Sequence, residues 1–347
     1  MNDAIAYTDR PEITNARILL SLMLLAAAFL FGDAVVGMRG IDVGTDTHNY
    51  AEFFLMVRSG VFSTRFEPGF VLVTRALAAA GVSVMTYQSV LFLLFLGTVL
   101  ISTRQYYKYL GSTHGYLTFL IAALMFLYLS PVTVNATINA VRQGLASLLV
   151  FAALLSFYQR QWRNFVLLGV LATSFHYSSL LYMLFAPALL LGERKLRLLA
   201  VMAFAAYCSG LTMMLIRSAL PGLYVTVMAY DANANYRSGV RLDFAVFSIF
   251  WYLLPFLASR LVREPFRELI NRSTAVYLVL LMPFFLVGWG NYSNRYLLPA
   301  WMSVSLVLAA IACNGRTTFL RNPLLLRGGL VVACGVFYYF VKNLVVV

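Results

Sequence analysis

The chain has 347 residues, 61% of them hydrophobic and only 11% charged, and its mean hydropathy is +0.81. A soluble domain is about half apolar and about a quarter charged, so this composition excludes an ordinary soluble fold and indicates a protein that sits mainly in lipid. The formal net charge is +13, and we expect the Arg and Lys residues to fix orientation at the cytoplasmic leaflet rather than to bind nucleic acid.

Ten apolar segments are candidates for membrane helices, because a helix needs about 20 apolar residues to cross the hydrocarbon core. In chain order they are Ile18–Val36, Met85–Thr103, Gly115–Ser130, Ala140–Tyr158, Asn164–Leu191, Leu196–Leu215, Phe244–Ser259, Ala275–Gly290, Tyr296–Cys313 and Gly328–Val346. The first lacks a convincing small-residue cleavage site, so we expect a retained anchor. No linker or repeat divides the sequence, which favours one membrane domain over residues 1–347.

Basic residues between these segments predict which loops face the cytoplasm. The loops with Arg160 and Arg194 fall on one side only if Asn164–Leu191 enters and returns, which predicts a hairpin of two short helices with its tip near Ser174–Ser178. The segment Pro68–Ala80 is short and contains an arginine, so we expect a re-entrant or interfacial helix there. The expected fold is all-α and polytopic, with about eleven crossings, a cytoplasmic N-terminus and an outer C-terminus.

Most polar residues of interest fall in the loops that this arrangement places outside. These loops are Met38–Glu67, Pro131–Ile138, the hairpin tip, Ser218–Leu242 and Asn291–Arg295. Lipid makes isolated ions costly, so ionisable residues gathered at one face indicate a site there.

The first outer loop contains GIDVGTDTHNYAEFF and STRFEPGF, with Asp42, Asp46, Tyr50, Arg65 and Glu67. Asp46 or Glu67 could deprotonate a sugar hydroxyl, because a low-dielectric pocket raises a carboxyl pKa toward the working pH. Asp42 with Asp46 also leaves a divalent cation open as an alternative. The competing interpretation is a solvated loop that only caps helices.

A polar stripe is predicted at the outer end of the Ala140–Tyr158 segment. Asn135, Asn139, Arg142 and Gln143 have offsets of 0, 4, 7 and 8, which share one helical face. An unpaired arginine within an apolar helix costs about 2.5–3.5 kcal/mol on insertion scales. Arg142 therefore needs an anionic partner or a wet cavity, unless it reaches the interface by snorkelling.

Two further residues stand out in the outer regions. His176, in SFHYSS, lies at the predicted hairpin tip, where broken helices are tolerated if they line a cavity or are buried in protein. It is a candidate for catalysis or ligand contact, or else a structural histidine. Arg295, in WGNYSNRY, is basic on the disfavoured side, which indicates phosphate or carboxylate binding rather than simple anchoring.

The loop Ser218–Leu242 combines aromatic and amide residues, among them Tyr236, that suit sugar rings. Tyrosine also populates membrane interfaces without a catalytic role. The sequence has no P-loop, GxGxxG, HExxH, CxxC or GxSxG motif. The three cysteines have no metal-ligand spacing. We expect neither a cofactor nor a metal ion.

In order, GTDTHNYAEFF, RFEPGF, NAVRQGLASLLVFAALL, LATSFHYSS and NRYLLP resemble the EpsG family of Wzy-type exopolysaccharide and O-antigen polymerases, across Asp42–Pro299. The sequence keeps the Asp-x-x-x-Tyr of the first loop as Asp46 and Tyr50, and the late Arg-Tyr as Arg295 and Tyr296. The resemblance implies a glycosyltransferase in the bacterial cytoplasmic membrane that joins repeat units carried on undecaprenyl diphosphate at the periplasmic face. It also implies glycan substrates on this carrier and a possible chain-length regulator as partners.

In such a transfer an acceptor hydroxyl attacks an anomeric carbon and undecaprenyl diphosphate departs, so a base and a charge sink are needed. We hypothesise that Glu67, Asp46 or His176 takes the proton. The diphosphate and sugar contacts are predicted to come from Arg142, Arg295, Arg65, Gln143, Asn139, Tyr50, Tyr296 and Tyr236. The alternatives are a flippase or transporter of the same lipid-linked sugars, an O-antigen ligase, and a membrane acyltransferase using His176.

Overall fold

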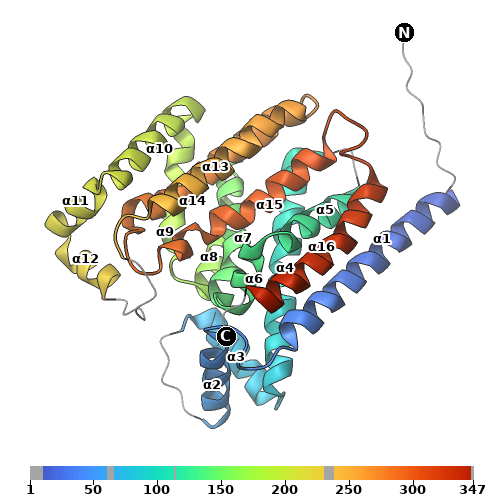
Figure 1. Cartoon of the computed structure of the whole chain (residues 1–347), viewed down its shortest axis with the longest axis horizontal. Coiled ribbons are helices and arrows are strands. Elements are labelled where there is room, and N and C mark those ends of the chain that lie inside the picture. Colours follow the sequence, from blue (N-terminus) through green and yellow to red (C-terminus); the bar gives the residue numbers. More distant parts are fainter. Residues whose placement is uncertain (1–10, 61–65, 113–114, 230–237, 345–347) are drawn as a thin grey trace.

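The computed structural model describes residues 11–60, 66–112, 115–229 and 238–344, which form helices joined by short loops (Figure 1). Seven helices in this part of the chain are long and apolar enough to cross a membrane, or nine if each of two bent pairs is one span. The expected fold class, an all-α polytopic membrane protein, is confirmed. The expected count of eleven crossings is not, because the two arms of the segment Asn164–Leu191 are too short to be counted among these helices.

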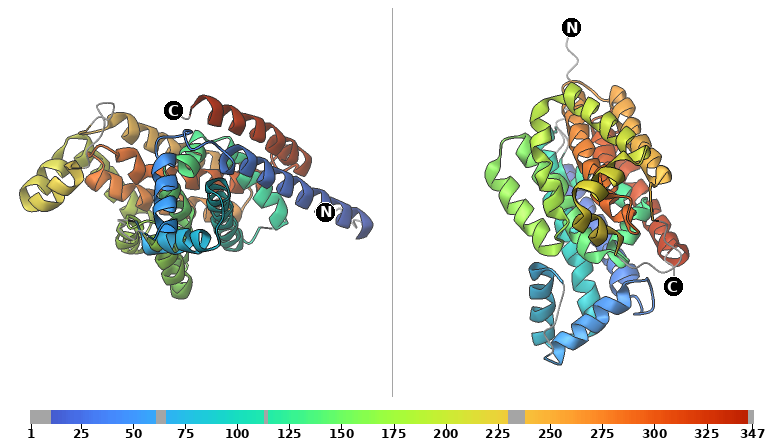
Figure 2. Two further views of the ribbon diagram at one scale, coloured as in Figure 1. Left: turned by 90° about the horizontal axis from the view of Figure 1, so that it is seen from below. Right: turned by 90° about the vertical axis from the view of Figure 1, so that its left-hand side faces the viewer.

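The N-terminal third contains α1 (Pro11–Gly32), which continues as a π-helical turn, η1 (Asp33–Gly37), followed by α2 (Thr47–Arg58), α3 (Pro68–Ala79) and α4 (Val84–Leu110). α2 and α3 pack on one another and project from one end of the bundle beside the start of α4 (Figures 1 and 2). The short helix expected at 68–80 is therefore present as α3. Its depth in a membrane stays a prediction.

The chain between residues 116 and 158 forms three helices, whereas the sequence predicts two helices joined by a loop. α5 (Tyr116–Tyr128) is followed by α6 (Pro131–Ile138) at an angle of 84°, and α7 (Val141–Tyr158) begins after a second break. The prediction of a loop at Pro131–Ile138 is wrong, because a proline at the first helical position starts a new helix. The stripe of polar residues predicted on one helical face is also wrong, because Asn135 belongs to α6 and Arg142 to α7.

A glycine permits this second break. A Cβ added at Gly144 would lie 2.0 Å from the carbonyl oxygen of Ala136, so only glycine lets the end of α6 lie against the start of α7. The Arg-Gln-Gly run therefore serves the local packing that carries Arg142 and Gln143 to the end of the bundle.

The predicted hairpin around His176 is confirmed. α8 (Trp162–Phe175) ends just before this residue, and α9 (Ser179–Leu184) with the 3-10 helix η2 (Ala186–Leu191) forms the returning arm. The predicted span Leu196–Leu215 is not one straight helix, because α10 (Glu193–Cys208) and α11 (Leu211–Ala219) meet at 80° around a glycine. The short helix α12 (Pro221–Met228) follows.

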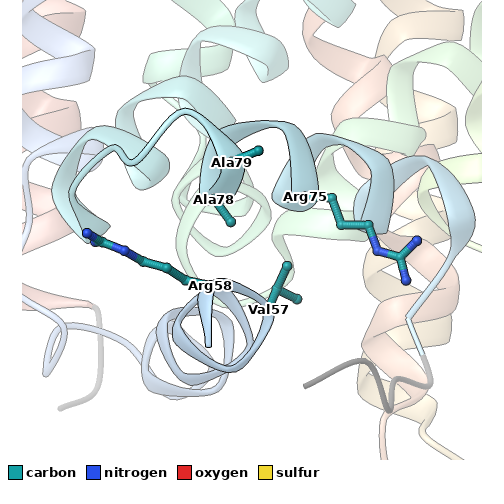
Figure 3. Close-up of a pocket in the computed structure, with 5 residues that line it drawn as sticks. All are labelled: Val57, Arg58, Arg75, Ala78 and Ala79. Atoms are coloured by element: carbon teal, nitrogen blue, oxygen red, sulfur yellow. The ribbon is translucent and has the colours of Figure 1, made fainter. Parts of the chain in front are cut away.

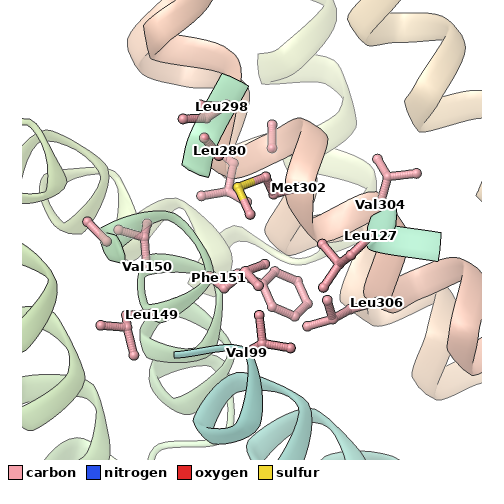
Figure 4. Close-up of a cluster of buried hydrophobic side chains, with 14 of the residues drawn as sticks. Val99, Leu127, Leu149, Val150, Phe151, Leu280, Leu298, Met302, Val304 and Leu306 are labelled. Carbon is pink, nitrogen blue, oxygen red and sulfur yellow. The ribbon is translucent and has the colours of Figure 1, made fainter. Parts of the chain in front are cut away.

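The C-terminal third supplies the rest of the bundle. Its elements are α13 (Leu242–Ala258), η3 (Ser259–Leu261), α14 (Phe266–Val287), η4 (Ser293–Leu297), α15 (Leu298–Cys313) and α16 (Pro323–Asn343). α7 packs against α4, α8 and α15, and its spanning part is mostly buried, whereas those of α1, α13 and α16 are mostly exposed. The central contacts include Val99, Phe151 and Leu306 (Figure 4). α7 is therefore a core helix, and the peripheral helices present their apolar faces to lipid.

The two ends of the central helices differ in chemistry. α7 and the η4–α15 segment start close to Arg142 and Arg295, and they run toward Arg160 and Arg316 respectively. At that far end Arg316 Nε donates to the Val262 carbonyl oxygen at 3.0 Å. The basic loops and the candidate site thus lie at opposite ends of these helices. Which end faces the cytoplasm stays a prediction.

Candidate active site

Glu67 occupies the first position before α3, and the chain around it explains how it arrives there. Its backbone is extended and Pro68 takes the first helical position, so the Glu-Pro-Gly run starts the helix directly after the carboxylate. A Cβ on Gly69 would lie 2.5 Å from Ser174 Oγ and 2.8 Å from the Ser174 carbonyl oxygen. Because this glycine lets α3 approach α8 closely, Glu67 lies against the break that contains His176.

The Glu67 carboxylate accepts three hydrogen bonds in a buried position. Arg142 Nη1 donates to Oε2 at 2.5 Å, His176 Nδ1 donates to Oε1 at 2.9 Å, and Tyr177 N donates to Oε1 at 3.3 Å. Only 3% of the Glu67 side chain is exposed, compared with 16% for Arg142 and 20% for His176. We call Glu67, Arg142 and His176 the inner cluster. It joins three elements that are far apart in sequence.

These contacts set the protonation states of the inner cluster. Burial alone would raise the pKa of Glu67, but the hydrogen bond from His176 and the charge of Arg142 outweigh it and lower the pKa to about 2. Our expectation that a pocket raises this pKa is wrong, because the pocket supplies donors and a cation. Burial lowers the pKa of His176, although Glu67 opposes the shift. At neutral pH Glu67 is ionised and His176 is neutral.

The ionised carboxylate also fixes the tautomer of the histidine. It can only accept, so the imidazole proton lies on Nδ1, and Nε2 keeps its lone pair. Nε2 has no hydrogen-bond partner in the described part of the chain. The arrangement resembles the carboxylate–histidine half of a catalytic triad, in which the acid orients the base without taking its proton.

Arg142 has the anionic partner that its position in an apolar helix requires, and it also touches two aromatic residues. Its guanidinium lies 4.5 Å from the ring centre of Phe66, within cation–π range. Its charge and a hydrogen bond act on the buried hydroxyl of Tyr50. Arg142 Nε is buried and has no hydrogen-bond partner among the described residues. This Nε donor is therefore buried and unsatisfied in the structure.

A second ion pair lies beside the inner cluster, and we call Asp46 and Arg295 the rim pair. Arg295 Nη2 donates to Asp46 Oδ2 at 3.0 Å, and the side chains are 26% and 24% exposed. The Arg295 guanidinium also lies 4.4 Å from the ring centre of Tyr292. Gln143 Nε2 donates to the Arg295 carbonyl oxygen, and the charge of Arg295 acts on His176. The two groups therefore form one site.

The remaining predicted residues contribute in different ways. The Thr45 amide donates to Asn139 Oδ1 at 2.9 Å, which fastens the first loop to the α6–α7 break. Tyr296 is tied in through its carbonyl oxygen, which accepts from the buried Tyr182 hydroxyl at 2.9 Å. Arg65 and Tyr236 lie outside the described residues. The structure thus brings together Glu67, Asp46, His176, Arg142, Arg295, Gln143, Asn139 and Tyr50.

Sequence reasoning missed three residues that hold this site together. Phe66 was read only as part of a motif, although its place beside Glu67 signals a contact with the same arginine. Arg39 donates to Thr47 Oγ1 at 3.2 Å through Nε and to the Val36 carbonyl oxygen at 2.6 Å, and no pattern in the first outer loop distinguishes it from the other polar residues there. Tyr182 lies in an apolar run where nothing distinguishes it from packing.

A separate pocket lies between α2 and α3. It has a volume of about 480 Å³ and is lined by Val57, Arg58, Arg75, Ala78 and Ala79. Figure 3 shows the two arginine side chains pointing away from each other. The pocket is at the C-terminal ends of both helices, whereas Glu67 precedes the N-terminal end of α3, so it is not part of the site. Among the described residues, no group of three or more His, Cys, Asp or Glu side chains has a metal-binding arrangement.

Comparison with known proteins agrees with the resemblance noted in the sequence. The family model described as the EpsG family matches residues 22–345. The amylovoran biosynthesis protein AmsC of Erwinia amylovora is 27% identical over 201 residues, which are 55% of this chain and 50% of that protein. The match thus spans about half of the length of this relative. No solved structure matches the chain significantly.

Proposed function

Because the chain belongs to the EpsG family, we propose that it is a glycosyltransferase that polymerises exopolysaccharide repeat units carried on undecaprenyl diphosphate. The acceptor sugar hydroxyl attacks the anomeric carbon of the growing chain, the new glycosidic bond forms, and the bond to the diphosphate breaks. The hydroxyl proton passes to a base, and undecaprenyl diphosphate leaves. The name of the relative AmsC, an amylovoran biosynthesis protein, supports a role in polysaccharide synthesis.

His176 is the base in this proposal. It is neutral at physiological pH because burial lowers its pKa, and Nε2 carries a free lone pair. Glu67 orients the ring through Nδ1 and stabilises the imidazolium that forms. With a pKa of about 2, Glu67 itself is too weak a base to accept the proton. Glu67 is therefore a positioning residue.

Arg142 and Arg295 bind the diphosphate and stabilise the charge that develops on it. Arginine suits this task because its planar fork binds phosphate oxygens in pairs and stays charged. The partly exposed Arg295 can exchange Asp46 for a phosphate oxygen, and Arg142, whose side chain is 16% exposed, adds a fixed positive charge beside it. A diphosphate is already a good leaving group, so positioning and electrostatics account for the step.

In this proposal the site lies on the periplasmic face of the bacterial cytoplasmic membrane. The basic loops lie at the opposite end of the central helices and obey the positive-inside rule if that end is cytoplasmic. The growing glycan then extends away from the cell interior, where a chain-length regulator can reach it. The alternative of a transporter predicts ionisable groups near the middle of several helices, whereas here they gather at one end.

One observation carries this proposal: Glu67, Arg142 and His176 form a single buried cluster beside Arg295. Deletion of the gene followed by a glycan gel tests it. We expect the ladder of long chains to disappear and single lipid-linked repeat units to accumulate. Long chains at normal abundance in the deletion strain would reject a polymerase.

A proteoliposome assay with purified protein separates the alternatives. A polymerase lengthens lipid-linked glycan without another protein. A flippase relocates the substrate and leaves its length unchanged, a ligase requires lipid A core as acceptor, and an acyltransferase requires an acyl donor.

A further inference from the structure

A groove beside the rim pair has the chemistry of a sugar-binding surface. It has a volume of about 500 Å³, within the range of about 300–1,000 Å³ for small-ligand pockets. It lies between α6, α13 and the η4–α15 segment. Its main lining side chains are Asn135, Asn294, Asp243, Phe244, Phe247 and Trp301. None of these six was selected as a site residue from the sequence, apart from the mention of Asn135 in the polar stripe.

The aromatic wall of the groove is rigid. Trp301 Nε1 donates to the buried Ser248 Oγ at 2.9 Å, which fixes the indole plane. Phe244 and Phe247 meet this ring edge to face, with centroids 5.7 Å and 5.3 Å away. Rigid aromatic rings lose little entropy on binding and present flat apolar faces. Such faces complement the C–H face of a pyranose ring.

The polar wall offers hydrogen bonds that the protein does not use. Asn135 and Asn294 are half-buried, and neither carboxamide has a hydrogen-bond partner among the described residues. At the mouth, Arg241 pairs with Asp243 at 2.6 Å and covers the Phe244 ring at 3.9 Å. Two free amides opposite fixed aromatic rings match the polar rim and apolar face of a sugar.

Two residues of the groove are close in the sequence to residues of the candidate active site. Asn294 precedes Arg295 of the rim pair, and Asn135 lies one helical turn before Asn139, which holds the first loop through Thr45. A glycan in the groove would therefore approach the reacting centre from the side of the rim pair.

A second groove in the same protein has a more apolar lining and serves as a comparison. It has a volume of about 420 Å³, lies between α3, α8 and α9, and is lined mainly by apolar side chains such as Val166, Val170 and Leu180. The groove with Trp301 differs in having two amides and a charged pair at its edge. Its chemistry therefore favours a polyhydroxylated ligand over an acyl or prenyl chain.

We propose that the groove formed by Asn135, Asn294, Phe244, Phe247 and Trp301 binds sugar residues of the repeat unit and aligns them with the reacting centre. This assignment rests on the proposed polymerase function and extends it to a substrate subsite. The amides bind ring hydroxyls, and the aromatic wall stacks on the sugar faces. The groove holds the glycan, and the inner cluster performs the transfer.

Tryptophan fluorescence tests glycan binding directly, with the full chain in lipid nanodiscs. The probe is the repeat-unit oligosaccharide released from its carrier lipid by mild acid. We expect saturable quenching that Trp301→Phe removes. Asn135→Ala and Asn294→Ala should each raise the Kd about fivefold, because each loses one hydrogen bond of ordinary strength. In the polymerisation assay the same variants should lower kcat/KM, because they weaken binding and alignment of the glycan.

The matched control is Phe250→Leu compared with Phe247→Leu. Both residues are exposed on α13, but only Phe247 lines the groove, so only Phe247→Leu should weaken binding. Size-exclusion profiles and thermal midpoints like those of the wild type show that each variant is folded. Failure of the oligosaccharide to quench, or unchanged Kd values in both asparagine variants, would overturn the groove assignment.

The two proposals can fail separately. If the wild type lengthens glycan but the groove variants keep the wild-type Kd and kcat/KM, the polymerase stands and the groove assignment falls. If the wild type binds the oligosaccharide through these residues but never lengthens glycan, the groove stands and the polymerase falls. In that case the protein is a glycan-binding membrane protein of another class.

Discussion

The inner cluster and the rim pair both contain ion pairs at the same end of the bundle, but they differ in burial. Glu67 is almost completely buried and receives donors from α7 and from the α8–α9 break. The Asp46–Arg295 pair is about a quarter exposed on both sides. A buried pair is rigid because neither partner has water as an alternative, whereas an exposed pair can exchange partners at little cost.

This difference indicates a division of labour within one site. The inner cluster holds a base and a cation in fixed positions, as preorganised catalysis requires. The rim pair holds an arginine that can exchange its carboxylate for a phosphate. Variants that separate structural from functional effects test this division.

Substitution of Arg142 and of Arg295 should give the largest difference between the two regions in the free energy of unfolding. Arg142→Ala leaves the Glu67 carboxylate buried with its main counterion gone, so we expect a loss of about 3–5 kcal/mol in the free energy of unfolding. Arg295→Ala should cost about 1 kcal/mol or less. Both should abolish the glycan ladder, because both bind the diphosphate. The measurements are thermal unfolding in detergent and a glycan gel of cells expressing each variant at the wild-type level.

Two results of these measurements would contradict the proposed difference between the inner cluster and the rim pair. Equal destabilisation by both substitutions would contradict the difference in burial. A normal ladder in the Arg295→Ala strain would remove the rim pair from the reaction and leave the inner cluster as the only charge sink.

The pH dependence of the inner cluster should give the next largest effect. The reaction needs neutral His176, so kcat/KM should rise as pH increases through the His176 pKa and level off above it. That pKa lies below the usual 6.5 because of burial, and Glu67 partly restores it. In Glu67→Gln the restoring charge is lost, so the acid limb should move to lower pH. The rate on the plateau should fall about 100-fold, because the ring loses its orienting carboxylate.

A pH profile measured with lipid-linked substrate in proteoliposomes checks this prediction. His176→Ala is the companion variant and should lose the acid limb together with at least about 100-fold in rate. An acid limb in Glu67→Gln that moves to higher pH would show that Glu67 does not support the protonated histidine.

A substitution that disturbs the close contact between α3 and α8 should have a smaller effect on the reaction rate. In Gly69→Ala the new Cβ meets the Ser174 side chain and carbonyl oxygen, so α3 must shift and Glu67 moves away from His176. Overpacking of this kind costs about 1–3 kcal/mol, and misplacement of a positioning residue should lower the rate by about tenfold or more. Gly97→Ala in α4 is the control, because its new Cβ meets nothing within 4 Å. A rate for Gly69→Ala equal to that of the control would contradict the role of this contact.

The sequence predicts the inner cluster better than it predicts the helices that build it. The cost of an arginine in lipid correctly demands an anion for Arg142, and the hairpin that the positive-inside rule predicts around His176 is present. Both arguments depend on the large energies of ions in lipid, which local packing cannot override. The pairing of Arg142 with Glu67, 75 positions earlier, could not be predicted, because no local pattern relates the two residues.

The bends at α5–α6 and α10–α11 were missed for a different reason. Hydropathy detects apolar length, but it does not detect where a chain turns within an apolar run. At Pro131 the proline allows both a loop and a new helix start. At Gly210 the left-handed backbone ends one helix and starts another. The groove beside Trp301 was missed because its lining comes from three elements that are far apart in the sequence.

The smallest expected effect concerns Asp46, and it decides which carboxylate matters for the chemistry. Asp46→Asn removes the charge of the rim pair but can keep a hydrogen bond to Arg295, so the free energy of unfolding should change by less than about 1 kcal/mol. If Asp46 only holds Arg295 between turnovers, the variant should keep its activity within about tenfold, and KM for lipid-linked substrate should not rise, because the arginine is freer to bind phosphate. If Asp46 is the base, the rate should fall by about 100-fold or more with KM unchanged. Steady-state kinetics of Asp46→Asn beside His176→Ala therefore identify the proton acceptor, because only one of the two substitutions should remove the proton-transfer step.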